Sequence, residues 1–340
     1  MGSRAFITGV SGFGLNAAER EFIRDERPWG LILFKRNIEA PAQVSNLVRE
    51  FQDLTKNPDA PVLIDQEGGR VQRLGPPHWP VYPPGAAFGA LYDIDPALGL
   101  SAARLSSRLI AADLIELGVT VDCLPLADVP VAGADAVIGN RAYGTEPGKV
   151  ASIARAVTEG LEQGGVLPVL KHIPGHGRAT ADSHFGLPTV DTARHELERT
   201  DFAAFQPLAD LPMAMTAHVV FSALDPAHPA TTSATIIEQV IRGVIGFQGL
   251  LMSDDVSMNA LAGTIAERTR AIVNAGCDMV LHCNGKLDEM RDVARETPEL
   301  AGEALVRAKR ALASRRQPGP LDRQAARAEL DALLDRVGTA

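Results

Sequence analysis

The chain has little cysteine, few aromatic residues and no long apolar run. Among 340 residues there are three cysteines, and Phe, Tyr and Trp together make up 5%. No apolar run approaches the roughly 18 residues that a membrane span needs, and the first 15 residues lack the charged start and apolar core of a secretory signal. We therefore expect a protein without a membrane span or a secretory leader.

Basic residues are also scarce relative to acidic ones. The 33 Lys and Arg against 42 Asp and Glu give a formal net charge of −9. No block of basic residues interleaved with aromatics is present, which argues against a nucleic-acid surface. An acidic protein also binds anionic lipid poorly. The expected partner is therefore a small molecule, with no nucleic acid and no membrane.

The cysteines are Cys123, Cys277 and Cys283. They are odd in number and lie in or beside apolar segments, so we interpret them as reduced, buried thiols of a cytoplasmic protein. A metal pair formed by Cys277 and Cys283 is the alternative. Because no second pair accompanies this spacing, core packing is the favoured interpretation.

Short apolar runs recur along almost the whole chain. They are continuously apolar rather than alternating, which is typical of strands covered on both faces in a parallel sheet. The predicted strands are Ala5–Thr8, Trp29–Phe34, Pro61–Asp65, Val119–Leu124, Val166–Lys171, Met213–His218, Leu250–Ser253 and Met279–His282.

Helical patterns separate these runs. The predicted helices are Asn16–Arg27, Ala42–Leu54, Ala97–Leu117, Lys149–Gln163, Ala193–Leu208, Ser233–Ile245 and Asn259–Ala275. Asn16 followed by Glu19 indicates a capping box at the first helix. Eight strand–helix repeats predict an α/β fold, a single (β/α)8 TIM-type barrel, with a doubly wound sheet as the alternative.

The last part of the chain, about residues 298–337, is predicted to be helical. Leu330, Leu333, Leu334 and Val337 share one helix face. We expect these extra C-terminal helices to pack on the barrel exterior, within a single catalytic domain of residues 1–340. An oligomer contact is the alternative for this face, and we expect a monomer or a weak oligomer.

Acids and arginines follow the third predicted strand, in the sequence DQEGGRVQR at residues 65–73. In a barrel, functional residues gather where strands end. Asp65 accepting and Arg73 donating hydrogen bonds would suit sugar hydroxyls. A salt-bridged turn on the rim is the alternative interpretation.

Two further strand ends carry reactive groups. The fifth predicted strand ends in Lys171 and His172, where the lysine would either form a Schiff base or donate a hydrogen bond to a hydroxyl. The seventh ends in Asp254 and Asp255, a pair that suits a nucleophilic carboxylate. Alternatively, Asp255 or Ser257 caps the next helix, and both interpretations are compatible.

The loop after the fifth strand is rich in histidine. Asp182 and His184 are two residues apart, so Asp182 would orient an imidazole that acts as general acid and base. A zinc site made of His172, His176, Asp182 and His184 is one alternative. The proline and glycines after His172 disfavour the helix that such a site would need. Loop histidines without a chemical role are the other alternative.

Several motifs in fixed order now indicate a family. KHIPGHG at 171–177, DSH at 182–184 and SDDVSM at 253–258 resemble the family 3 glycoside hydrolases, and in particular the bacterial β-N-acetylglucosaminidases of peptidoglycan recycling. GLILF at 30–34, the acidic turn at 65–73 and VIGNR at 137–141 fit the same pattern. The resemblance spans roughly residues 5–285, and Ile173 replaces the family's usual Phe.

This resemblance implies a role for each matching residue. Asp254 would be the nucleophile, and His184, paired with Asp182, the acid/base. Five residues would hold the sugar: Asp65, Arg73, Arg141, Lys171 and His172. In many other family members, such as β-glucosidases, the acid/base comes from a second domain or a different segment, so the loop that carries Asp182 and His184 is essential to this assignment.

The implied reaction is retaining hydrolysis of terminal N-acetylglucosamine from peptidoglycan fragments. The fragments are N-acetylglucosaminyl-anhydro-N-acetylmuramic acid with or without a peptide, and no metal or cofactor is implied. Another exo-β-glycosidase, such as a glucosidase or xylosidase, is the main alternative. A Schiff-base lyase using Lys171, a metal hydrolase and a non-catalytic sugar-binding protein are further alternatives.

Overall fold

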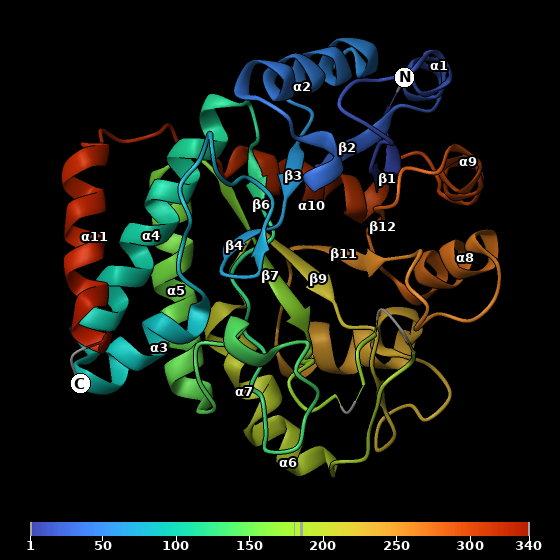
Figure 1. Cartoon of the computed structure of the whole chain (residues 1–340). Coiled ribbons are helices and arrows are strands. Elements are labelled where there is room, and N and C mark those ends of the chain that lie inside the picture. Colours follow the sequence, from blue (N-terminus) through green and yellow to red (C-terminus); the bar gives the residue numbers. More distant parts are fainter. Residues whose placement is uncertain (1, 180, 184–185, 339–340) are drawn as a thin grey trace.

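The computed structural model describes residues 2–179, 181–183 and 186–338. Parallel strands close into a barrel in the order β1-β12-β11-β9-β7-β6-β3-β2 (Figure 1). The barrel strands are β1 (Arg4–Thr8), β2 (Pro28–Leu33), β3 (Val62–Ile64), β6 (Val121–Asp122), β7 (Leu167–Ile173), β9 (Met213–Thr216), β11 (Leu250–Asp255) and β12 (Met279–His282). Because β1 pairs with both β12 and β2, the sheet has no edge, and the doubly wound alternative is wrong.

Each predicted apolar run overlaps one barrel strand, and the two faces of that strand have different neighbours. Ile7 and Leu63 belong to the cluster that fills the barrel. Phe6, Leu31 and Ile64 point to the other side and join the larger cluster formed with the helices. Since both faces of each strand are buried, the strands read as continuous apolar runs, as expected for a parallel sheet covered by helices.

Helices surround the barrel (Figure 1). Those that follow the strands are α1 (Ala17–Glu26), α2 (Pro41–Thr55), α3 (Gly85–Ile94), α4 (Pro96–Glu116), α5 (Pro147–Gln163), α6 (Arg194–Arg199), α7 (Asp201–Phe205), η5 (Ile236–Val244), α8 (Ile265–Ala275) and α9 (Leu287–Glu296). The predicted capping box is confirmed, because Asn16 accepts from the Glu19 N–H at 3.0 Å and Glu19 accepts from the Asn16 N–H at 2.9 Å.

Some predicted helix bounds were wrong. The predicted helix 193–208 divides at Thr200 into α6, α7 and a short 3₁₀ turn. The predicted helix 259–275 begins six residues later, at Ile265. There Thr264 caps the helix, and Gly263 has a φ of 87° that a helix cannot contain. Helices α3 and α9 were not predicted.

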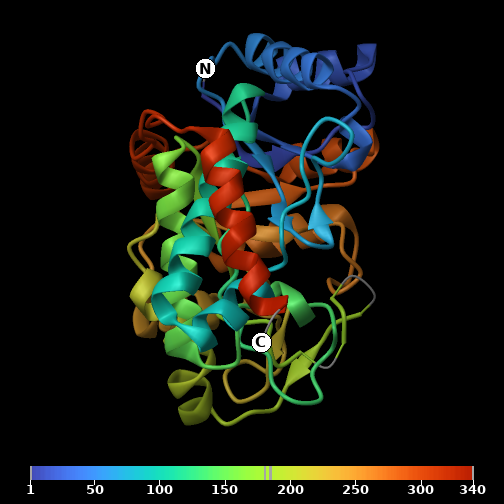
Figure 2. The ribbon, with the colours of Figure 1, turned by 60° about the vertical axis from the view of Figure 1, so that its left-hand side comes forward.

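The C-terminal segment forms two helices, α10 (Gly302–Ala313) and α11 (Arg323–Gly338), with Pro318 and Pro320 between them. Helix α11 lies along α4 and contacts α3, as both views of the ribbon show (Figures 1 and 2). Leu330 is completely buried there, while Leu333 and Leu334 are partly buried against the core. That residues 1–340 form a single catalytic domain stays a prediction.

Two small sheets stand beyond the barrel. Strands β4 (Gln66–Gly68) and β5 (Val71–Gln72) form a hairpin after β3, and β8 (Thr189–Val190) pairs with β10 (Val220–Phe221). Gly68 turns the hairpin with a φ of 92°, and a Cβ at this position would lie 2.2 Å from the Pro83 carbonyl oxygen. Across the described residues, every helix is too short or too polar to cross a bilayer.

Candidate active site

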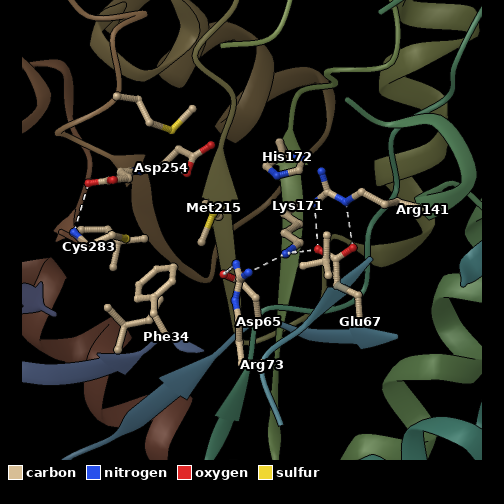
Figure 3. Close-up of a pocket in the computed structure, with 15 residues that line it drawn as sticks. Phe34, Asp65, Glu67, Arg73, Arg141, Lys171, His172, Met215, Asp254 and Cys283 are labelled. Carbon is tan, nitrogen blue, oxygen red and sulfur yellow. Dashed lines mark hydrogen bonds and ion pairs between the residues drawn. The ribbon is translucent and has the colours of Figure 1, made fainter. Parts of the chain in front are cut away.

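One cavity of about 150 Å³ opens at the carboxyl ends of the barrel strands. Six of the eight predicted site residues line it: Asp65, Arg73, Arg141, Lys171, His172 and Asp254 (Figure 3). They come from the ends of β3, β7 and β11 and from the loops after β5 and β6. In a closed parallel barrel these ends share one rim, which brings together side chains that are far apart in sequence.

A network of five charged side chains forms one side of the cavity (Figure 3). The Lys171 ammonium donates to Asp65 at 3.0 Å and lies 2.6 Å from a Glu67 oxygen. Arg73 donates to the second Asp65 oxygen at 2.9 Å. Arg141 holds Glu67 with two hydrogen bonds of 2.7 and 2.8 Å, a bidentate geometry that fixes both partners. Three cations thus surround two carboxylates.

Mutual attraction keeps this network ionised. Burial by itself would raise the pKa of each carboxyl group. However, Lys171 and Arg73 hold the pKa of Asp65 well below its usual range, and Lys171 and Arg141 lower that of Glu67 to about 2. Burial would likewise lower the pKa of Lys171, but Asp65 and Glu67 raise it above its ordinary value. Since a Schiff base requires a neutral amine, this environment contradicts the lyase alternative.

His172 is fixed by a carboxylate that the sequence analysis did not single out. Asp128 is completely buried, and its Oδ2 lies 2.7 Å from Nδ1 of His172. Burial would raise the pKa of Asp128, but His172 and His176 lower it, so this group is a carboxylate that only accepts. His172 therefore donates through Nδ1. The His176 N–H donates to Oδ1 of the same carboxylate at 2.6 Å, which ties the following loop to the strand end.

Asp254 lies across the cavity from Arg141 and Glu67 (Figure 3). One of its oxygens accepts the Asp255 N–H at 2.8 Å. The pairing of β11 with β12 shifts register between Met252 and Asp255, so that three steps along β11 match two steps along β12.

Asp255 makes different contacts from those of Asp254. It accepts from the Ser257 hydroxyl at 2.6 Å and from the Cys283 N–H at 3.1 Å. The next helix is capped by Thr264, so the suggestion that Asp255 or Ser257 caps it is wrong. Asp255 instead closes a turn and connects β11 to the end of β12.

Apolar side chains complete the cavity. They are Ile32, Phe34, Val71, Met215, Met258, Leu281 and Cys283. Arg36 and Arg73 lie over the Phe34 ring, 4.9 and 5.1 Å from its centre, close enough for cation–π attraction. Cys283 is buried as predicted, and burial raises the pKa of its thiol well above the ordinary value.

The sequence around this cavity matches a known protein family. The model for the glycosyl hydrolase family 3 N-terminal domain matches residues 8–310. The chain belongs to glycosyl hydrolase family 3. The matched range contains every residue of the cavity.

Relatives of this family 3 hydrolase have similar length and fold. A beta-hexosaminidase of Alkalilimnicola ehrlichii is 40% identical over 282 residues, which are 82% of this chain and 80% of that protein. A beta-hexosaminidase of Neisseria meningitidis is 38% identical, over 87% of this chain and 83% of its own. NagZ from Neisseria gonorrhoeae, in complex with N-trifluoroacetyl-D-glucosamine, superposes with a TM-score of 0.88 at 32% identity, covering 98% of this chain and 99% of its own.

Two further residues of the family 3 hydrolase were predicted to belong to the site, Asp182 and His184. His184 lies outside the described residues. Asp182 is described but is not among the described residues that line the cavity. Between them, Ser183 is buried, its hydroxyl lies 3.1 Å from Nε2 of His176 and its carbonyl accepts the Ala260 N–H at 3.2 Å. The Asp182–His184 pair stays a prediction.

The zinc alternative gains no support from the described residues, where no group of three or more His, Cys, Asp or Glu is arranged to hold a metal. His172 uses Nδ1 for Asp128. Burial and the neighbouring His172 lower the pKa of His176 to about 4, so its imidazole is neutral near pH 7. Cys277 and Cys283 belong to different apolar clusters, as expected for core residues rather than a metal pair.

Sequence reasoning missed Glu67 and Asp128 as members of the site. Glu67 follows Asp65 by two residues, and in an extended segment such residues face the same side, so this spacing was a usable signal. Asp128 stands in an apolar stretch four residues beyond Leu124, where the fourth predicted strand ends. Only its buried contact with His172 shows that it belongs to the site.

The charged network predicts a pH-dependent stability. Replacing Glu67 by Gln leaves Arg141 and Lys171 short of a buried partner, which typically costs about 3–5 kcal/mol. The folded-state pKa of Glu67 is depressed from 4.5 to about 2, so its contribution is complete above 4.5 and is lost as pH falls towards 2. Denaturant unfolding of wild type and Glu67→Gln should therefore show a large stability gap at pH 7 that narrows at pH 3.

Glu303→Gln is the matched control, because the Glu303 side chain is 78% exposed and its ion pair with Arg307 is long, at 3.9 Å. An exposed pair of this kind contributes about 0–1 kcal/mol. Equal losses in the two variants, or a gap for Glu67→Gln that does not change with pH, would contradict the assigned network.

Proposed function

We propose that this family 3 glycoside hydrolase is an exo-acting, retaining β-N-acetylglucosaminidase that removes terminal N-acetylglucosamine from peptidoglycan fragments. One observation carries the proposal. Asp254 and the ionised network of Asp65, Arg73 and Lys171 line opposite sides of one small cavity. The relatives named beta-hexosaminidase and the NagZ structure with a glucosamine derivative support the choice of sugar.

The network suits the hydroxyl groups of a pyranose. A hydroxyl both donates and accepts, so it is held best where a fixed acceptor stands beside fixed donors. Asp65 is a permanent acceptor, and Lys171 and Arg73 are permanent donors held within 3.0 Å of it. Arg141 and His172 place further polar groups around the same cavity. Because these groups are already oriented by one another, little ordering remains for the sugar to induce.

In the first half of the proposed reaction, an Asp254 oxygen attacks the anomeric carbon. A C–O bond to Asp254 forms as the bond from the anomeric carbon to the leaving oxygen breaks. Protonated His184 gives its proton to that oxygen, so the leaving group departs as an alcohol. His184 is then neutral, and Asp182 would hold its tautomer and orientation.

In the second half, neutral His184 takes a proton from a water molecule. The water oxygen bonds to the anomeric carbon and the bond to Asp254 breaks, which restores the carboxylate and the imidazolium. Two inversions give overall retention. The anchoring of Ser183 to His176 and to Ala260 supports this role, because it ties the segment before His184 both to the end of β7 and to the loop after Asp254.

We also propose that the substrate is N-acetylglucosaminyl-anhydro-N-acetylmuramic acid, with or without a peptide, and that the enzyme works in the cytoplasm as a monomer or a weak oligomer. A cavity of about 150 Å³ suits a terminal sugar rather than the middle of a chain. The three free, buried thiols suit a reducing compartment.

The choice of sugar is tested with aryl β-glycosides. We expect kcat/KM for the N-acetylglucosaminide to exceed that for the glucoside and the xyloside by at least about 10²-fold, because a site built to hydrogen-bond a group rejects analogues that lack it. NMR of the first-formed sugar should show the β-anomer. Preference for the glucoside would favour the other exo-glycosidase, and a first-formed α-anomer would refute retention.

The nucleophile is tested by Asp254→Asn. Loss of the attacking carboxylate should lower kcat at least about 10³-fold with an unchanged circular dichroism spectrum. A fluorinated N-acetylglucosamine analogue should label the peptide that contains Asp254 in the wild type. Asp288→Asn, at a side chain that is 97% exposed, is the matched control. Near-normal turnover by Asp254→Asn, or a label on another peptide, would remove Asp254 from the mechanism.

The acid/base is tested by His184→Ala. General acid catalysis matters most for a poor leaving group, so kcat for a disaccharide should fall about 10²–10⁴-fold while an activated aryl glycoside loses much less. His195→Ala changes an exposed histidine on α6 and serves as control. Equal losses on both substrates would indicate that His184 has a structural part instead.

A further inference from the structure

The β4–β5 hairpin rests on the chain that follows it, residues 80–84, here called the support segment. The Gly69 N–H, at the turn of the hairpin, donates to the Tyr82 carbonyl at 2.9 Å. The Tyr82 N–H in turn donates to Oε1 of Gln72, in β5, at 2.9 Å. The place of the hairpin therefore depends on where the support segment is held.

The hairpin brings two charged side chains to the cavity. Glu67 belongs to β4, Arg73 follows β5 directly, and both line the cavity. Hairpin and support segment are in close backbone contact, because a Cβ at Gly68 would collide with the Pro83 carbonyl. Since closely packed groups cannot move independently, a shift of the support segment would displace Glu67 and Arg73.

The support segment is held from the other side by the side chain of Tyr82. This side chain is buried, and its hydroxyl donates to Oδ2 of Asp113 on α4 at 2.6 Å. The other oxygen of Asp113 accepts from Arg323 of α11 at 2.9 Å. Arg327, one turn later in α11, donates to the Val81 carbonyl at 3.1 Å and lies over the Tyr82 ring, 5.8 Å from its centre. Helix α11 thus clamps Tyr82 against α4.

Helix α11 is remote from the cavity, since none of its residues is among the described residues that line it. It lies along α4 (Figures 1 and 2), where Leu330 is completely buried. Direct contacts lead from α11 to Tyr82, from Tyr82 to the hairpin, and from the hairpin to the cavity. Such a continuous series of packed and hydrogen-bonded groups can couple distant places.

We propose that Tyr82, clamped between Asp113 and α11, is a positioning residue for the terminal sugar: it sets the place of Glu67 and Arg73 without lining the cavity. This inference rests on the proposed function, since the sugar is the ligand that the charged network holds. It gives a role in substrate binding to a helix that lies beyond residues 8–310, the range that matches the family model.

The test uses the full-length chain with Tyr82→Phe, which removes one hydroxyl and keeps the buried ring. KM for an aryl N-acetylglucosaminide and Ki for N-acetylglucosamine should both rise about fivefold, the effect of roughly one lost hydrogen bond. The value of kcat should change less than about twofold, because Asp254 belongs to β11 and not to the hairpin. Tyr92→Phe makes the same change at a half-buried tyrosine of α3 and should leave KM and Ki unchanged.

Native-state hydrogen exchange tests the restraint on the hairpin without any substrate. In Tyr82→Phe the amides of Gly69 and Tyr82 should exchange about fivefold faster, while the amides of β11 keep their wild-type rates. Arg327→Ala should change exchange and Ki in the same direction by about twofold, because the Arg327 side chain is 36% exposed. Arg327→Lys keeps a cation over the Tyr82 ring and should restore most of the loss.

Faster exchange with an unchanged Ki would mean that Tyr82 only stabilises the fold, and would overturn the proposal. Unchanged exchange, or an equal rise of Ki in Tyr92→Phe, would overturn it too. If the wild type neither cleaves the glycoside nor binds N-acetylglucosamine, the proposed function itself fails, and the exchange rates alone decide whether Tyr82 restrains the hairpin. Wild-type turnover with the same KM and Ki in Tyr82→Phe refutes the positioning role alone.

Discussion

The position of one ammonium group organises the site. Lys171 lies between Asp65 and Glu67, and each of these carboxylates has an arginine on its other side. Replacing any one of these charged side chains would leave a buried charge of the opposite sign without enough partners, which strongly destabilises the folded protein. The network therefore holds the β4–β5 hairpin, the end of β7 and the short helix with Arg141 in one arrangement.

Two further carboxylates, Asp128 and Asp255, connect the strand ends and loops at the same rim of the barrel. Asp128 accepts from His172 and from the His176 N–H, and Asp255 connects the ends of β11 and β12, so both carboxylates hold the rim together. The two adjacent acids at the end of β11 differ in their contacts, because Asp254 accepts the Asp255 N–H whereas Asp255 accepts from Ser257 and Cys283. The relatives in glycosyl hydrolase family 3 share this fold with high structural similarity.

Much of this arrangement was predictable, and the exceptions have physical causes. The strands that contain Ile7 and Leu63 are buried on both faces, and a continuous apolar run in the sequence predicts such strands. The capping box at Asn16 is likewise a local pattern. The start of α8 was missed because Gly263 and Thr264 decide it against the surrounding helical composition. The roles of Asp254, Asp182 and His184 stay predictions, with His184 outside the described residues.

The sequence by itself determined that strands and helices alternate and which reactive side chains follow each strand, because burial and capping are local properties of neighbouring residues. Only the tertiary structure decided which charges meet: Glu67 with Lys171 and Arg141, and Asp128 with His172. Asp128 and His172 are 44 positions apart in the sequence, and Glu67 and Lys171 are 104 positions apart. Their distances follow from closure of the barrel and from the loops above it, which no local pattern encodes.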